Sequence, residues 1–138
     1  MSGEKIGIVA ADYYADITDK MLDVAKVHIK FLEAEVVKII RTPGSFELPL
    51  AAKKLLSDTD IDGVVALGAV IEGDTDHDQI VATNAARKLA DLALDAGKPV
   101  GLGISGPKMT RMDAVKRIEK SAKGAVESVV KMLRRLKE

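Results

Sequence analysis

The chain has 138 residues, enough for one hydrophobic core, and its 47% apolar and 30% charged residues exclude a disordered protein. Its 21 basic and 21 acidic residues balance, so long-range attraction to nucleic acid or to an anionic membrane surface is not expected. Cysteine is absent, which excludes disulfides, thiolate nucleophiles and sulfur-ligated metals, and no apolar run reaches the length of a membrane span. We therefore expect a cytoplasmic protein.

The first half of the chain predicts two strands and two helices. Residues 5–11 are largely apolar and predict a strand, and apolar residues recur at spacings of three and four over residues 16–32, which predicts a helix. Residues 35–42 contain the β-branched run VVKII, which predicts a second strand. A short helix is predicted over residues 46–57.

The second half predicts the same alternation. The nine apolar residues 63–71 are bounded by turn residues, a pattern typical of a fully buried parallel strand. Residues 76–95 predict a helix and residues 99–105 a fourth strand. The last helix is predicted over residues 110–136, with a break expected near residues 121–124.

Alternating strands and helices predict an α/β fold, with a mostly parallel sheet covered by helices on both faces. The simplest arrangement is one flavodoxin-like domain over residues 1–138, with four strands in the order 2-1-3-4. The long apolar stripe of the last helix exceeds what such a small sheet can cover, so we expect a homo-oligomer.

Ligands bind at the carboxyl edge of such sheets, where the loops that follow the strands meet. Three of the four aromatic residues of the chain, Tyr13, Tyr14 and Phe46, fall in these loops. This placement favours equally a surface that stacks on a planar ring and a contact between subunits. A shared site between subunits satisfies both interpretations.

The two histidines receive different interpretations. His77 falls in the first turn of a predicted helix, where the helix dipole favours a neutral imidazole that could carry a proton. The alternative is a solvent-facing residue paired with Asp74 or Asp78. His28 lies among apolar helix residues and is predicted to pack in the core or in an interface.

Gly73, Asp74 and Thr75 precede the same helix and could bind a phosphate through backbone N–H groups, although Asp74 and Thr75 also form an ordinary helix cap. The carboxylates around His77 repel a phosphate, so basic residues from the last segment must balance them; the candidates are Lys108, Arg111, Arg117 and Lys123. These carboxylates could also hold a divalent ion, but they lack EF-hand spacing and alternate between faces, so no metal is expected.

The segment from Gly101 to Gly106 matches the dinucleotide fingerprint G-x-G-x-x-G by its letters. That fingerprint opens a strand-helix-strand unit, whereas only one helical segment follows here. We therefore interpret these glycines as positions of close packing and of a tight turn.

The segments PGSFELPLAAKKL (residues 43–55) and ALGAVIEGDTDHD (residues 66–78) resemble the lumazine synthase family, and the likeness covers nearly the whole chain. It looks closest to the archaeal branch. The resemblance implies an αβα sandwich that assembles as pentamers, in many members as a shell of twelve pentamers, with active sites between subunits. It also implies condensation of 5-amino-6-(D-ribitylamino)uracil with 3,4-dihydroxy-2-butanone 4-phosphate to 6,7-dimethyl-8-ribityllumazine, phosphate and water. No cofactor is implied, and riboflavin synthase is the implied protein partner.

The resemblance also implies roles for individual residues. His77 matches the proton-transfer residue. The substrate-binding positions are Tyr13, Ser45, Phe46, Glu47, Val70, Ile71, Glu72 and Leu102. The phosphate-binding positions are Gly73, Asp74, Thr75, Arg117 and Lys123, and Arg117 is implied to reach the phosphate across a subunit boundary.

This chain departs from the family pattern at two of these positions. Glu72 stands where many members have a basic residue, and Leu102 stands where many have a Phe against the pyrimidine. Two other functions stay open, and these departures give room to the second of them. One is an archaeal-type riboflavin synthase, which converts lumazine alone. The other is an inactive scaffold that binds flavin or forms shells.

Overall fold

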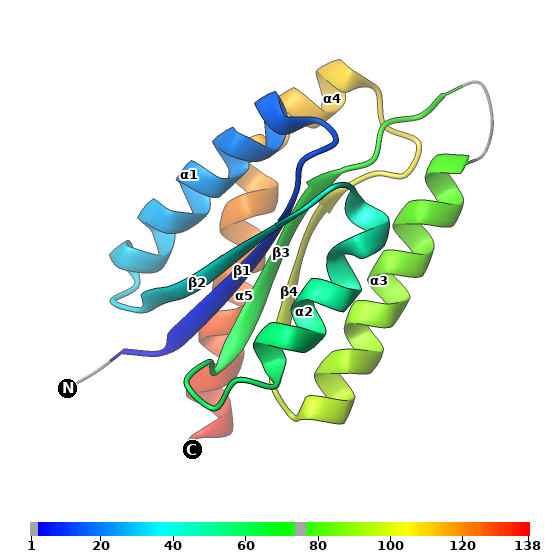
Figure 1. Cartoon of the computed structure of the whole chain (residues 1–138). Coiled ribbons are helices and arrows are strands. Elements are labelled where there is room, and N and C mark those ends of the chain that lie inside the picture. The colour runs from blue at the N-terminus through cyan, green and yellow to red at the C-terminus, as the bar shows by residue number, and fades with distance from the viewer. Residues whose placement is uncertain (1–2, 74–76) are drawn as a thin grey trace.

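The computed structural model describes residues 3–73 and 77–138. Its sheet has the strand order β2-β1-β3-β4, as predicted, and every neighbouring pair of strands is parallel. The strands are β1 (Lys5–Ala11), β2 (Glu35–Thr42), β3 (Gly63–Ala69) and β4 (Val100–Ser105). Their carboxyl ends therefore lie at one edge of the sheet (Figure 1).

Helices cover both faces of this sheet (Figure 1). One face carries α1 (Ala15–Phe31) and α5 (Ile118–Leu136), which also pack on each other, and the short α4 (Arg111–Lys116) precedes α5. The other face carries α2 (Leu48–Leu56) and α3 (His77–Ala96). These layers form the expected three-layer αβα sandwich of flavodoxin-like proteins.

The core lies on both sides of the two central strands. Because side chains alternate along a strand, Ile6 and Ile8 of β1 point to the cluster under α1 and α5. Val9 of the same strand points to the cluster under α2. Every residue of β3 is buried, which explains its continuous apolar sequence. In the described part of the chain, none of the helices is both long and apolar enough to cross a membrane.

Two elements end or begin differently from the prediction. The helix expected from residue 46 starts as the 3₁₀ turn η1 (Ser45–Glu47) and continues as α2, whose first turn contains a proline. The strand expected to reach residue 71 ends at Ala69, where its partner β4 also ends. Pro107 follows shortly after β4 and has no N–H with which to extend the ladder.

The break in the last helix was predicted near residues 121–124, and this prediction is wrong. The helix is interrupted at Arg117, between α4 and α5, and it runs without a break through Gly124. A glycine inside a helix costs only about 1 kcal/mol relative to alanine. Burial of the surrounding α5 side chains, among them Ala122, Ala125 and Val126, outweighs that cost.

The glycines of the fingerprint-like segment have the structural roles that were predicted. A side chain at Gly101 would overlap the carbonyl oxygen of Ala125, so this glycine lets α5 lie directly against β4. A side chain at Gly103 would come within 2.8 Å of the Leu67 side chain and within 2.9 Å of the Ala66 carbonyl oxygen, both on β3. Gly106 has a φ of 112°, which favours glycine, in the turn after β4.

Candidate functional site

Three of the loops at the carboxyl edge enclose a pocket of about 420 Å³. They follow β1, β2 and β3, so residues far apart in the sequence meet because their strands are parallel neighbours. The pocket is lined by Tyr13, Tyr14, Gly44, Ser45, Phe46, Ala69, Val70, Ile71, Glu72, Gly73, His77, Asp78 and Val81. The lining is largely apolar, with a few polar groups, as expected for a site that binds a small molecule.

Two aromatic side chains stand exposed at this pocket. The exposed fraction is 75% for Tyr13 and 55% for Phe46. Tyr13 contacts the ring of Tyr14 edge to face, with 5.0 Å between ring centroids, and the guanidinium of Arg111 lies 5.8 Å from the centroid of the Tyr14 ring. Exposed rings that border a pocket can stack on a planar ligand or pack against another subunit, so both interpretations made from the sequence stay open.

Residues of the first two strands hold the loop that carries Tyr13. The backbone N–H of Asp12 donates to the carbonyl of Thr42 at 2.7 Å, which extends the β1–β2 ladder beyond its last pair. Arg41 of β2 donates from Nε to Asp12 at 2.7 Å and from its terminal nitrogen to Asp19 at 2.6 Å. The hydrogen bond to Asp19 raises the pKa of Arg41, so the guanidinium stays charged.

The loop after β2 places Ser45 and Phe46 in the pocket wall. The hydroxyl of Thr42 donates to the carbonyl of Gly44 at 2.8 Å, which closes the turn before η1. Ser45 is 6% exposed and packs against Gly68 of β3, where a side chain on the glycine would come within 2.8 Å of Ser45 Oγ. Glu47 belongs to the same turn but does not line the pocket.

The segment after β3 supplies backbone groups and His77. Val70 donates its N–H to the carbonyl of Ser105 at 2.7 Å, and Glu72 donates its N–H to the carbonyl of Met109 at 2.9 Å. His77 is the first residue of α3 and its side chain is exposed, as expected for a helix start. The predicted phosphate residues Asp74 and Thr75 lie outside the described residues.

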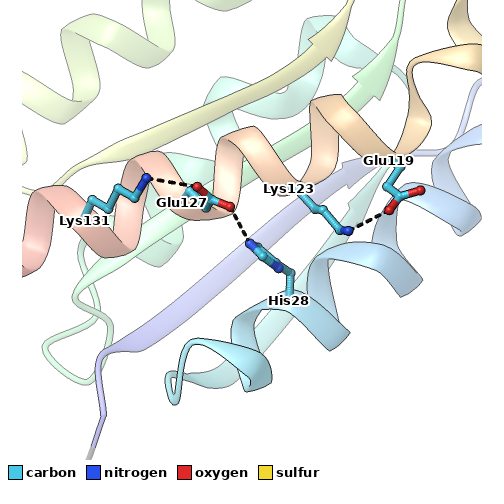
Figure 2. A network of polar contacts seen from close by, with 5 residues as sticks. All are labelled: His28, Glu119, Lys123, Glu127 and Lys131. Atoms are coloured by element: carbon cyan, nitrogen blue, oxygen red, sulfur yellow. Dashed lines mark hydrogen bonds and ion pairs between the residues drawn. The ribbon is translucent and has the colours of Figure 1, made fainter.

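Three further predicted residues do not reach the pocket of their own chain. Leu102 lies in the middle of the edge strand β4 and is 52% exposed. Arg117 is exposed at the junction of α4 and α5. Lys123 lies on α5, where its Nζ is 2.6 Å from Glu119 (Figure 2).

His28 lies away from the pocket, between α1 and α5. Its Nε2 is 2.9 Å from Glu127 of α5, which also pairs with Lys131 (Figure 2). The imidazole side chain is 11% exposed and stacks on Phe31, with 5.8 Å between centroids. His28 thus joins two helices of its own chain and is partly buried, outside the two hydrophobic clusters, and its place in a subunit interface stays a prediction.

Two residues of this edge were not recognised from the sequence as site residues. Asp78 was treated as a carboxylate of the helix start, but it lines the pocket and is only 7% exposed. Arg41 lies on β2 outside the pocket lining and holds the loop of Tyr13 through Asp12. Nothing in the sequence reveals the partners of either side chain, because those partners lie in loops and a helix far away along the chain.

The whole chain matches proteins of known name. The family model of 6,7-dimethyl-8-ribityllumazine synthase matches residues 3–137. A 6,7-dimethyl-8-ribityllumazine synthase of Methanothermobacter thermautotrophicus is 59% identical over 138 residues, which are 100% of this chain and 99% of that protein. Proteins of the same name from Methanopyrus kandleri and Archaeoglobus fulgidus are 54% and 53% identical over the whole chain and cover 97% and 96% of their own lengths. These sources are archaeal, which confirms the expected branch.

Proposed function

The chain belongs to the 6,7-dimethyl-8-ribityllumazine synthase family, and we propose on that basis that it is a transferase of riboflavin biosynthesis. It condenses 5-amino-6-(D-ribitylamino)uracil with 3,4-dihydroxy-2-butanone 4-phosphate and releases 6,7-dimethyl-8-ribityllumazine, phosphate and water. The observation that carries this function is the family match over residues 3–137, together with a pocket at the carboxyl edge. The substrates are polar or charged small molecules that do not cross membranes unaided, so we place the reaction in the cytoplasm.

In this proposal the apolar part of the pocket binds the pyrimidine substrate. Tyr13 stacks on the pyrimidine ring, and the exposed position of its side chain supports this role. The turn of Ser45, Phe46 and Glu47 binds the ribityl chain, with the Glu47 carboxylate accepting hydrogen bonds from its hydroxyls. The backbone of residues 70–72 hydrogen-bonds the pyrimidine edge, which the location of these residues in the pocket wall supports.

The phosphate of the second substrate binds at the start of α3. Gly73, Asp74 and Thr75, which precede α3 in the sequence, are the proposed phosphate-binding positions, and the positive end of the helix dipole adds to the attraction. Glu72 and Asp78 also line this pocket and oppose an anion, so a cation from elsewhere must balance them. Arg117 and Lys123 are the proposed cations.

These cations point to an assembly of several copies. Arg117, Lys123 and Leu102 all lie outside the pocket of their own chain, and two of them are well exposed. We propose that a neighbouring copy supplies them, so that the active site lies between two subunits of a homo-oligomer. A pentamer is the proposed unit and a shell of twelve pentamers the larger alternative, which sedimentation of the purified protein would separate.

The chemistry needs proton transfers and close placement of two reactants. The 5-amino group attacks the ketone and the adduct loses one water to give an imine, phosphate is then eliminated, and ring closure expels a second water. Holding both substrates in one pocket contributes most, since orientation alone can supply roughly 7–11 kcal/mol of the barrier reduction. His77 moves protons in these steps and adds about 10²–10⁴-fold.

The direct test is to mix the purified protein with both substrates. We expect the lumazine chromophore and free phosphate to appear in equal amounts, and absence of both would refute the proposal.

The two alternatives are not favoured by the comparisons. Lumazine supplied alone should not yield riboflavin. A protein that bound flavin tightly but did not convert the two substrates would support the scaffold alternative instead. Riboflavin synthase, which consumes the product, is the proposed protein partner, and co-sedimentation would detect it.

A further inference from the structure

A buried carboxylate in the first turn of α3 contacts the loop that follows β4. Asp78 is 7% exposed, although an acidic residue at a helix start commonly faces solvent. Its Oδ2 accepts a hydrogen bond from the backbone N–H of Lys108 at 3.0 Å. A charged acceptor in a buried setting makes this a strong hydrogen bond, and it joins two segments thirty positions apart in the chain.

The loop that Asp78 contacts is itself attached to the segment after β3. Gly106 packs so closely on Val70 that a side chain there would overlap the carbonyl oxygen of Val70. Two backbone hydrogen bonds join the same two segments on either side of Gly106. The N–H of Val70 donates to the carbonyl of Ser105, and the N–H of Glu72 donates to the carbonyl of Met109. The loop of residues 105–109 thus contacts one wall of the pocket along its backbone.

Lys108 adopts a backbone conformation that a non-glycine residue rarely adopts, with a φ of 59°. The N–H of Lys108 donates to Asp78, and this hydrogen bond offsets part of the cost of the unfavourable φ. Loss of the Asp78 carboxylate would remove that compensation. We therefore expect the loop to depend on Asp78 for its conformation.

We propose that Asp78 is a positioning residue that sets where His77 stands relative to the backbone of residues 70–72. The connection runs from residues 70–72 through the loop of residues 105–109 to Asp78, the direct neighbour of His77. This proposal rests on the proposed function, in which residues 70–72 hold the pyrimidine and His77 moves the proton. A proton donor or acceptor must lie within hydrogen-bond reach of its substrate atom, so the rate depends on this distance.

The proposal is tested with two substitutions at Asp78 and one matched control. Asp78→Ala removes the acceptor, and Asp78→Asn keeps an oxygen that can accept the N–H of Lys108. The control is Asp62→Ala, because Asp62 also accepts a backbone N–H, that of Lys5 at 2.8 Å, but at the opposite edge of the sheet. For each full-length protein we measure kcat, KM for both substrates, the melting temperature, and hydrogen exchange of the peptide covering residues 105–109.

We expect Asp78→Ala to lower kcat roughly 10- to 100-fold, since a displacement of about 1 Å can cost 10²-fold, while KM changes by less than about threefold. Hydrogen exchange in residues 105–109 should become faster in this variant. Asp78→Asn should restore most of the kcat and the slow exchange. Asp62→Ala should lower the melting temperature and leave kcat unchanged.

Several outcomes would overturn the proposal. A wild-type kcat in Asp78→Ala, a rise in KM without a fall in kcat, or an Asp78→Asn variant as slow as Asp78→Ala would each remove Asp78 from this role. So would unchanged hydrogen exchange in residues 105–109, a readout that needs no turnover. A wild-type chain that forms no lumazine would instead refute the proposed function, so the two failures are distinguishable.

Discussion

Nε of Arg41 lies 2.7 Å from Oδ1 of Asp12, and this contact joins the carboxyl end of β2 to the loop that carries Tyr13. The same guanidinium also reaches Asp19 on α1. One side chain outside the pocket therefore ties a pocket loop to both a strand and a helix. Its removal should therefore weaken ligand binding as well as lower stability slightly.

Arg41→Met keeps the aliphatic stem and removes both ion pairs. Because exposed ion pairs contribute about 0–1 kcal/mol, we expect the free energy of unfolding to fall by less than about 1 kcal/mol. Affinity for the pyrimidine substrate should fall about threefold, the equivalent of about 0.7 kcal/mol, as the Tyr13 loop loosens. The measurements are a ligand titration and denaturant unfolding. The control Lys5→Met removes the 2.7 Å pair with Asp60 at the other end of the sheet, and an equal loss of affinity there would contradict the prediction.

His77→Ala should slow the enzyme without abolishing it. The expected loss in the single-turnover rate is about 10²–10⁴-fold, the usual contribution of one general acid or base, and placement of the two substrates accounts for the activity that remains. His28→Gln is the control, because His28 is the other histidine of the chain and joins α1 to α5. An undiminished rate in His77→Ala would remove this residue from the mechanism.

A shared active site makes a further prediction for mixed assemblies. Arg117→Ala alone should weaken use of the phosphorylated substrate. If His77 and Arg117 of one site come from different copies, coexpression of His77→Ala and Arg117→Ala chains should leave about a quarter of the sites intact. Activity of the mixture should then exceed that of both parent variants. Activity no higher than the average of the parents would place both residues of each site on one chain.

Replacement by alanine should have opposite effects on stability at two glycines, Gly101 of β4, which packs against α5, and Gly124 within α5. In Gly101→Ala the new methyl group meets the carbonyl oxygen of Ala125, and we expect overpacking to cost about 1–3 kcal/mol in unfolding free energy. In Gly124→Ala the methyl group meets nothing within 4 Å, and the helix should gain about 0.5–1 kcal/mol. Denaturant unfolding of both variants checks this pair. Equal effects of the two substitutions would mean that α5 does not pack on β4 as described.

Glu4 makes stability depend on pH. Burial raises the pKa of Glu4, but the hydrogen bond and charge of Arg134, with the charge of Lys137, lower it overall. A group with a lowered folded pKa stabilises the fold fully above its unfolded pKa, and this contribution is lost as the pH falls through the folded value. At neutral pH, Glu4→Gln should therefore cost about 2 kcal/mol.

The difference between the wild type and Glu4→Gln should shrink as the pH falls below the ordinary range of a glutamate. Unfolding curves measured from neutral to acidic pH test this expectation. The carboxylate joins the start of the chain to the end of α5, so both termini should loosen together in acid. A difference that is constant over this range would assign the effect to packing rather than to charge.

Much of the fold could be predicted from the sequence. The alternation of β-branched runs and amphipathic segments predicted every strand and the strand order, because a parallel sheet with short connections allows few arrangements. The break at Arg117 could not be predicted. It falls where α4 ends and α5 begins, with Ala114 and Ile118 on either side buried in the same cluster, whereas Gly124 offered a misleading local signal.

The sequence by itself determined which loops meet at the carboxyl edge and that Tyr13, Phe46 and His77 lie there, since strand direction follows from the order of the elements. Only the tertiary structure decided that Asp78 is buried against Lys108 and that Arg41 holds Asp12. It also decided that Arg117 lies away from the pocket of its own chain. The physical reason is that periodicity records which face of an element is apolar, whereas the partner of a polar side chain depends on residues brought near it only by folding.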